Sequence, residues 1–294
     1  MKCQAKAVAC MIASAFGFAL MGVLVRLCDD YGGPVSSFQK SFFRNVIAFA
    51  VALAVFCRGC SAGQRISVSF GWRSWLVLVL RAAVGTVGVF AHFYALGEVP
   101  IADAQTLNKT APFFTVIFAW LFLGERVARS QAAALAVAFA GMLLVVKPGF
   151  AGADAFPLAI GLLGGVAAGG AYACLRKLGS CGVDGAFIVL FFSAFSCLAS
   201  LPFMIAGFDP MNASQVLIMA GAGAGAALGQ FGITAAYRFA APRSIAVFDY
   251  TNIVFSAALG FVFFAQVPDL WSASGFVVIV CAAAAMGRKG GNGK

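Results

Sequence analysis

Ten predominantly apolar runs, each close to the length of a membrane-spanning helix, dominate this sequence. An α-helix needs about 20 such residues to cross the roughly 30 Å hydrocarbon core of a bilayer. The runs lie at about 6–28, 40–58, 73–97, 101–123, 130–147, 156–175, 185–206, 214–237, 244–265 and 268–287. Only short connections separate them, so the sequence predicts an all-α, polytopic membrane protein with ten transmembrane helices and no room for a soluble domain.

The amino-acid composition excludes several other classes of protein. Hydrophobic residues make up 62% of the 294 residues and charged residues only 10%, whereas a soluble domain carries roughly 25% charged residues. A soluble enzyme, a secreted disulfide scaffold, a disordered chain and a nucleic-acid-binding protein are therefore excluded. The net charge of +10 is spread between the apolar runs instead of forming a patch. The expected partners are the lipid bilayer and a small-molecule substrate, with no nucleic acid.

The basic residues predict how the chain is oriented in the membrane. If the N-terminus is cytoplasmic, 14 of the 20 basic residues fall on the cytoplasmic side of the runs and three on the outer side. The remaining three, Arg44, Arg81 and Lys109, lie inside runs. Positively charged loops stay in the cytoplasm during insertion, so both termini are expected to be cytoplasmic.

Residues that usually carry enzyme or metal chemistry are scarce in this chain. The sequence has one histidine, His92, and contains neither a GxSxG segment nor a His/Asp/Glu cluster with metal-ligand spacing. Most of the nine cysteines lie inside apolar runs, where cysteine usually behaves as a small hydrophobic residue. Cys57 and Cys60 form a CxxC without a second pair. We therefore expect no cofactor, no bound metal and no enzymatic activity.

Two segments about half a chain apart resemble each other. Residues 102–125 and residues 245–266 each follow a Pro and a Tyr, lie on a predicted span and precede one last short span. Their separation, close to half the chain, divides the protein into two five-helix repeats at 1–148 and 155–288. Because five is odd, the second repeat must insert upside down. Inverted repeats occur in many secondary transporters, which bind substrate near the midplane between the repeats.

The motifs in these repeats are similar to those of a known family. The pattern in the fourth span comprises Leu107, Pro112-Phe113-Phe114 and Leu123-Gly124-Glu125. Together with Arg81 in the third span, this pattern resembles the EamA branch of the drug/metabolite transporter superfamily. The second half departs from this pattern at Ile253 and Gln266, which replace the proline and the glutamate. The resemblance covers almost the whole chain. It implies a ten-helix carrier of small metabolites or drugs, often an exporter of amino-acid-like compounds, in the bacterial inner membrane.

Ionisable residues inside a membrane span are costly and usually face the protein interior, so they mark candidate sites. The sequence has five of them: Arg44, Arg81, His92, Lys109 and Asp249. With neighbouring amides and one aromatic residue, the predicted substrate site consists of Arg81, His92, Asn108, Lys109, Asp249, Tyr250 and Asn252. Cationic groups outnumber the single carboxylate, which favours an anionic or zwitterionic solute.

Several of these residues also have a plainer interpretation. Arg81 and Asp249 lie about 9 Å and about 8 Å from the cytoplasmic edge at 1.5 Å per residue. We expect them to pair, either to close the inner mouth or only to hold two helices together. His92 fits a packing role as well as that of a proton carrier. Lys109 can extend toward the outer interface, and Arg44 lies near the outer edge, where a topological or headgroup role is favoured.

Glycines recur every four residues in the sixth and eighth spans. They are Gly161, Gly165 and Gly169, and Gly221, Gly225 and Gly229. Small residues at this spacing let helix backbones approach closely, which predicts tight packing and also suits a smooth surface along which one half moves against the other. Pro112 removes a backbone hydrogen bond and is expected to loosen the fourth span. Glu125 is assigned to a charge cluster at the inner helix end, outside the binding site.

The sequence thus predicts a secondary transporter that moves a small polar metabolite, amino-acid-like or an organic anion, across the inner membrane by alternating access, with export the expected direction. A drug or multidrug efflux carrier is the alternative. A channel is disfavoured because the sequence shows no repeated filter segment or charged ring. Asp249 or His92 would carry the proton in a proton-coupled mechanism, whereas facilitated diffusion and exchange need neither. A homodimer is compatible with the sequence.

Overall fold

A computed structural model describes residues 2–61, 71–99, 101–149, 154–265 and 267–291. Every regular element in this part of the chain is helical. The elements are α1 (Lys2–Asp30), α2 (Ser37–Ser61), α3 (Trp72–Glu98), α4 (Ile101–Asn108), α5 (Ala111–Leu123), α6 (Arg129–Val146), α7 (Ala155–Ser180), α8 (Gly185–Ala206), α9 (Ala213–Phe239), α10 (Pro242–Ile245), the 3-10 helix η1 (Ala246–Tyr250), α11 (Thr251–Phe264) and α12 (Leu270–Gly291).

The ten predicted spans correspond to these helices. The fourth span is divided into α4 and α5 and the ninth into α10, η1 and α11, while each of the others is a single helix. Among the described residues, nine segments are long and apolar enough to cross a membrane, and a further apolar helix, Leu270–Met286, is shorter. The protein is therefore a multi-pass membrane protein, and the predicted all-α fold is confirmed.

The interruptions in the fourth and ninth spans occur at matching places. α4 ends at Asn108 and α5 begins at Ala111, while η1 ends at Tyr250 and passes directly into α11. Pro112 lies in the first turn of α5, where a helix needs no amide hydrogen. The fourth span therefore breaks just before the proline. The ninth span is irregular at the equivalent level although it has Ile253 where the fourth has Pro112.

The C-terminal ends of α5 and α11 match as well. Gly124 follows α5 with a φ of 67°, and Ala265 follows α11 with a φ of 53°. This left-handed backbone costs a residue with a side chain roughly 1–2 kcal/mol. Gly124 and Ala265 are separated by the same 141 residues that separate Lys109 from Tyr250. The fourth span and the ninth span are therefore interrupted and end at equivalent positions.

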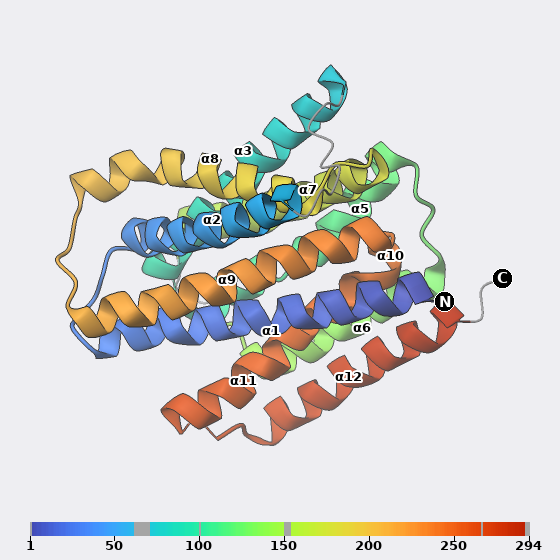
Figure 1. The fold of residues 1–294 in the computed structure, drawn as a ribbon. Coiled ribbons are helices and arrows are strands. Elements are labelled where there is room, and N and C mark those ends of the chain that lie inside the picture. The colour runs from blue at the N-terminus through green and yellow to red at the C-terminus, as the bar shows by residue number, and fades with distance from the viewer. Residues whose placement is uncertain (1, 62–70, 100, 150–153, 266, 292–294) are drawn as a thin grey trace.

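The helices pair mainly across the two halves of the chain. α1 packs along α9 and α3 along α7, while α2 contacts α8 and α6 contacts α12 (Figure 1). Taken in order, the counterparts of α1, α2, α3 and α6 in the second half are α7, α8, α9 and α12. If each helix is exchanged for its counterpart, the pair α1–α9 becomes α7–α3. The pairs α2–α8 and α6–α12 map onto themselves. The two halves therefore interleave instead of forming separate bundles.

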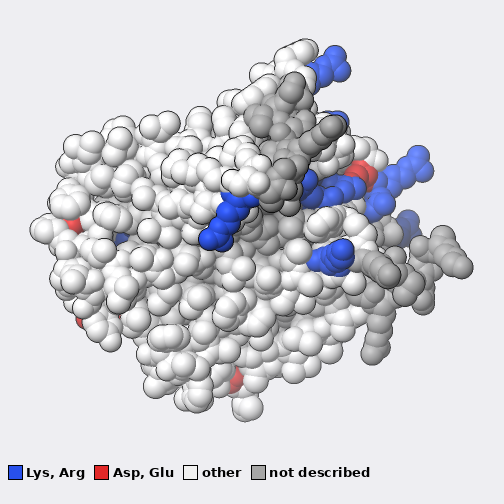
Figure 2. Space-filling model, viewed as in Figure 1, with Lys and Arg blue, Asp and Glu red and all other residues white. Residues whose placement is uncertain are grey.

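The start of α1 and the end of α12 lie at the same end of the bundle, which we call the terminal end (Figure 1). Lys and Arg side chains gather toward this end in the view of Figure 2. The largest cluster of buried apolar residues also lies toward it and includes Met11, Leu178, Ile233 and Tyr237. Nearer the opposite end, the cluster around Cys28 is smaller. Apolar packing is therefore most extensive toward the terminal end.

The glycine stripes lie where helices approach most closely. A Cβ atom on Gly225 would lie 2.9 Å from the Gly17 carbonyl oxygen of α1, and one on Gly169 would lie 2.9 Å from the Ala111 carbonyl oxygen of α5. Real Cβ atoms hardly ever come this close to other atoms. Gly221 meets only a leucine side chain. The predicted close packing is thus observed, and in each stripe at least one glycine faces the backbone of a neighbouring helix.

Candidate functional site

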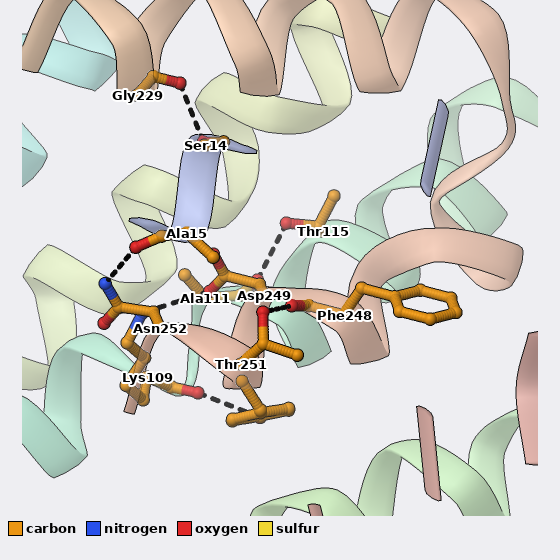
Figure 3. A network of polar contacts seen from close by, with 11 residues as sticks. Ser14, Ala15, Lys109, Ala111, Thr115, Gly229, Phe248, Asp249, Thr251 and Asn252 are labelled. Atoms are coloured by element: carbon orange, nitrogen blue, oxygen red, sulfur yellow. Dashed lines mark hydrogen bonds and ion pairs between the residues drawn. The ribbon is translucent and has the colours of Figure 1, made fainter. Parts of the chain in front are cut away.

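An ion pair joins the interruptions of the two halves. Lys109 lies at the α4–α5 break and Asp249 lies in η1, and Lys109 Nζ is 3.3 Å from Asp249 Oδ2 (Figure 3). The two side chains are only 13% and 9% exposed. Tyr250 Oη also donates a hydrogen bond to the Lys109 carbonyl oxygen at 3.0 Å. The fourth and ninth spans are therefore connected at their breaks through both a side chain and the backbone.

Helix α1 holds the ninth span at the same level. Asn252 Nδ2 donates a hydrogen bond to the Ala15 carbonyl oxygen at 2.8 Å. The neighbouring Ser14 Oγ donates to the Gly229 carbonyl oxygen of α9 at 2.7 Å (Figure 3). Adjacent residues of α1 thus contact α11 and α9, two elements of the second half.

Arg81 of α3 is almost completely buried, with 1% of its surface exposed. Its Nη2 donates a hydrogen bond to Gln230 Oε1 at 3.1 Å, and its guanidinium carbon lies 4.1 Å from the centre of the Phe192 ring. The predicted pairing of Arg81 with Asp249 is therefore wrong, because Asp249 pairs with Lys109. The α4–α5 break brings Lys109 to the level of η1, and its side chain does not extend toward the outer interface.

Arg44 of α2 is a second buried arginine, and its predicted position at the outer membrane edge is wrong. Only 5% of it is exposed, which contradicts a headgroup role at the membrane edge. Its Nη2 donates a hydrogen bond to Asn45 Oδ1 at 3.3 Å, and its guanidinium carbon lies 5.9 Å from the centre of the Phe93 ring. The sequence did contain a signal, because small and polar residues recur at spacings of three and four along the buried face of α2: Ser41, Arg44, Ala48 and Ala52.

These groups surround an internal cavity of about 170 Å³. The five ionisable residues that were singled out within the predicted spans all line it: Arg44, Arg81, His92, Lys109 and Asp249. The predicted site residues Asn108 and Asn252 line it too, whereas Tyr250 contacts Lys109 from outside the lining. The lining also contains polar residues absent from the predicted site: Gln105, Tyr172, Gln230 and Ser256. Six of the seven predicted residues therefore meet at one cavity.

His92 presents an unpaired polar atom in this region. Its Nδ1 is buried and has no hydrogen-bond partner among the described residues. Its ring centre lies 6.1 Å from that of Phe93. A buried polar atom without a partner is costly, so this nitrogen is available for a hydrogen bond to a solute.

Three further ion pairs of the described residues lie outside the cavity, and one of them, Lys40–Asp29, joins α2 to the end of α1. Glu125 Oε1 accepts a hydrogen bond from Arg176 Nε at 2.8 Å at the terminal end, in agreement with the assignment of Glu125 to a charge cluster there. Lys147 and Asp269 form an exposed pair near the opposite end, between α6 and α12. Hydrogen bonds from Lys147 and Ser272 lower the pKa of Asp269 to about 2. All three pairs join helix ends, and none of their residues lines the cavity.

Comparison with known proteins places this arrangement in a family. The model of the EamA-like transporter family matches residues 5–147. The pseudopaline exporter CntI of Pseudomonas aeruginosa is 31% identical over 94% of this chain and 94% of its own length. The riboflavin transporter of Brucella anthropi is 26% identical over 91% of this chain and 94% of its own length. Human solute carrier family 35 member G1 is 24% identical over 91% of this chain and 74% of its own length.

The fold also occurs among solved structures. One crystal structure superposes with a TM-score of 0.74 at 22% sequence identity, covering 93% of this chain and 96% of the other. That likeness concerns the fold alone. The sequence identity to the Pseudomonas exporter, over nearly the full length of both chains, shows the family as well as the fold. This chain belongs to the EamA-like transporter family.

Proposed function

We propose that this protein is a secondary transporter that moves a small anionic or zwitterionic metabolite by alternating access between two inverted five-helix halves, residues 1–148 and 155–288. One observation carries the proposal. A cavity of about 170 Å³ that is lined by five ionisable side chains lies where the interrupted helices of the two halves meet. Transporters commonly place their substrate site at such interruptions, near the midplane.

The arrangement of the helices supports the inverted repeat. Exchanging the halves converts the pair α1–α9 into α7–α3 and preserves the pairs α2–α8 and α6–α12. The interruptions and left-handed ends of α5 and α11 recur at equivalent positions. Because each half contributes an odd number of spans, the two units run in opposite directions through the membrane.

The packing around the cavity supports a state closed at the terminal end. Leu178, Ile233 and Tyr237 of the large apolar cluster lie between the cavity and that end. Arg44 and His92 line the cavity on the side of the opposite end. Transport then requires the apolar cluster to separate while the opposite side closes, which is the alternation expected of a carrier.

The distribution of charge supports cytoplasmic termini. The basic side chains gather toward the terminal end (Figure 2), and positively charged segments remain in the cytoplasm during insertion. The bacterial transporters to which the chain is similar support a location in the inner membrane. The terminal end then faces the cytoplasm, and the structure corresponds to a state that is closed on the cytoplasmic side.

The cavity itself favours a small polar solute over a drug-sized one. At about 170 Å³ it is smaller than the roughly 300–1,000 Å³ of typical ligand pockets. Its buried charges favour an ionic solute, whereas a multidrug carrier needs a larger, more apolar pocket. The name of the Pseudomonas relative supports export as the direction of transport.

A transport assay with the purified full-length protein in proteoliposomes tests this function. We expect saturable uptake and counterflow of at least one anionic or zwitterionic member of a panel of amino acids, nucleosides and organic anions. Comparison with and without a pH gradient separates proton coupling from facilitated diffusion and exchange. Absence of saturable flux for the whole panel would contradict a carrier, and chemical change of the solute would indicate an enzyme.

A cavity-filling variant links the flux to the site. Ser256 lines the cavity, so Ser256→Phe is expected to reduce counterflow by about tenfold or more, because the added ring occupies the space of the solute. Ser274 lies exposed on α12, so Ser274→Phe is the matched control and should transport normally. Equal transport by both variants would place the transport path elsewhere.

A further inference from the structure

The cavity contains two buried arginines that no acidic side chain neutralises. The chain has ten acidic residues, and all of them lie in its described part. The only one that lines the cavity is Asp249, and it pairs with Lys109. Arg44 and Arg81 contact amide oxygens, a thioether and phenyl rings instead. With Lys109 and Asp249 compensating each other, the two guanidinium groups leave the cavity with two positive charges.

The two arginines are held in the same manner. Each donates a hydrogen bond to one amide oxygen, Arg44 to that of Asn45 and Arg81 to that of Gln230. Each lies against a phenyl ring, and each has a buried Nε without a hydrogen-bond partner among the described residues. A ring face orients a guanidinium plane and weakly stabilises its charge, while the N–H edge remains available for a planar anion.

A glycine makes room for this placement of Arg81. A Cβ atom on Gly85 would lie 2.5 Å from Arg81 Nη1 and 3.0 Å from the Phe192 ring. The side chain of Arg81 therefore runs along α3 to the level of Gly85. The guanidinium of Arg44 lies near Phe93 of the same helix. Eight residues separate these two levels, which corresponds to about 12 Å along the helix axis.

The α3 face between these levels presents Gly88, Val89 and His92 to the cavity, and Phe18, Phe93 and Phe192 also line it. Two cationic positions at separate levels of one small cavity match a solute with an anionic group at each end and a short hydrocarbon link, which can pack against Val89 and the phenyl rings. One carboxylate alone is too short to reach both levels. The small volume of the cavity also excludes anions that carry a large additional group.

We propose that the substrate is a small dicarboxylate, with one carboxylate bound by Arg44 and the other by Arg81. The transport of this dicarboxylate rests on the proposed function, whereas its binding does not. Guanidinium groups bind carboxylates through two parallel hydrogen bonds, and an uncompensated buried charge is costly. The solute therefore supplies the two negative charges that the protein omits, and the Lys109–Asp249 pair needs no rearrangement for it to bind.

Ligand-induced thermal stabilisation of the purified full-length protein tests the proposal. The probes are malonate, succinate, glutarate and adipate, with valerate as the monocarboxylate and putrescine as the dication, all at equal ionic strength. Glutarate and adipate are expected to raise the melting temperature in a saturable manner. Malonate, which is shorter, and valerate, which has one carboxylate, should bind about tenfold or more weakly. Stabilisation by valerate or putrescine alone, or by none of these probes, would overturn the proposal.

Paired variants on the same helices identify the residues. Arg44→Gln and Arg81→Gln should each weaken glutarate binding by about tenfold or more, in line with loss of a charge-assisted hydrogen-bond pair. Without ligand both variants should melt at or above the temperature of the unaltered protein, since each removes an uncompensated buried charge. Arg58→Gln on α2 and Arg73→Gln on α3 change exposed arginines and should bind normally. Undiminished binding in both cavity variants would contradict the assignment.

The counterflow assay separates this proposal from the proposed function. Glutarate binding without counterflow of any solute would support the dicarboxylate site and reject the carrier. Counterflow of a neutral or monocarboxylate amino acid, with no inhibition by any dicarboxylate, would support the carrier and reject the dicarboxylate site.

Discussion

Lys109→Met is expected to reduce counterflow by about a hundredfold and to destabilise the protein, because it leaves the Asp249 carboxylate buried without its partner. Breaking a buried ion pair from one side typically costs about 3–5 kcal/mol. The Asp249 side chain is 9% exposed, so water replaces little of the lost interaction. Thermal unfolding and counterflow of the purified variant measure the two effects.

A double variant separates the stability effect from the transport effect. Replacing both members of a buried pair with apolar residues is often neutral or stabilising. Lys109→Met/Asp249→Leu is therefore expected to regain the melting temperature of the unaltered protein but not its transport. Lys147→Met is the matched control, because it breaks an ion pair whose side chains are 44% and 51% exposed and should leave the melting temperature nearly unchanged. A double variant as unstable as Lys109→Met would contradict the role of the pair.

Gly165→Ala should have a comparably large effect without altering any charge. A Cβ atom at this position would overlap Thr110 Oγ1 and the Leu107 carbonyl oxygen, both next to the α4–α5 break. Backbone cannot move aside as a side chain can, so α7 must shift away from the break, at a cost of about 1–3 kcal/mol or more. We expect a lower melting temperature and strongly reduced counterflow.

Gly170→Ala on the same helix provides the matched control. The nearest atom to its Cβ position is 3.5 Å away, in the Phe118 ring, which is an ordinary van der Waals distance. Alanine is intrinsically favoured over glycine in a helix by about 1 kcal/mol. This variant should therefore be as stable as the unaltered protein or slightly more stable. Equal behaviour of the two alanine variants would show that the close approach at Gly165 is not required.

The spans were predictable because membrane insertion imposes local requirements on sequence. About 20 apolar residues are needed per helix, and this length is visible without knowledge of partners. The interior position of Arg81, His92, Lys109 and Asp249 followed from the cost of charge in lipid. The matching segments at 102–125 and 245–266 likewise correspond to the two spans that are divided into shorter helices.

The pairing within the site was not predictable in the same way. Depth along straight helices placed Arg81 and Asp249 together, but the choice of partner depends on which helices are neighbours and where they break. Pro112 located one break approximately, whereas the ninth span has Ile253 at the equivalent position and carries no such signal. The distance of Arg44 from the membrane edge is a poor guide to its burial, because Arg44 lies on the small and polar face of α2 that packs inside the protein.

The most direct test of the central claim, that one buried cavity opens alternately to the two sides of the membrane, is modification of a single cysteine at Ser256. The variant Ser256→Cys is prepared in a background whose nine native cysteines are replaced by alanine, and is reconstituted with a thiol trapped inside the vesicles. A membrane-impermeant thiol reagent supplied outside should modify the cysteine while the trapped thiol remains intact, and reagent loaded inside vesicles that lack the trapped thiol should modify it as well. Modification from one face only, or consumption of the trapped thiol as through an open pore, would contradict alternating access.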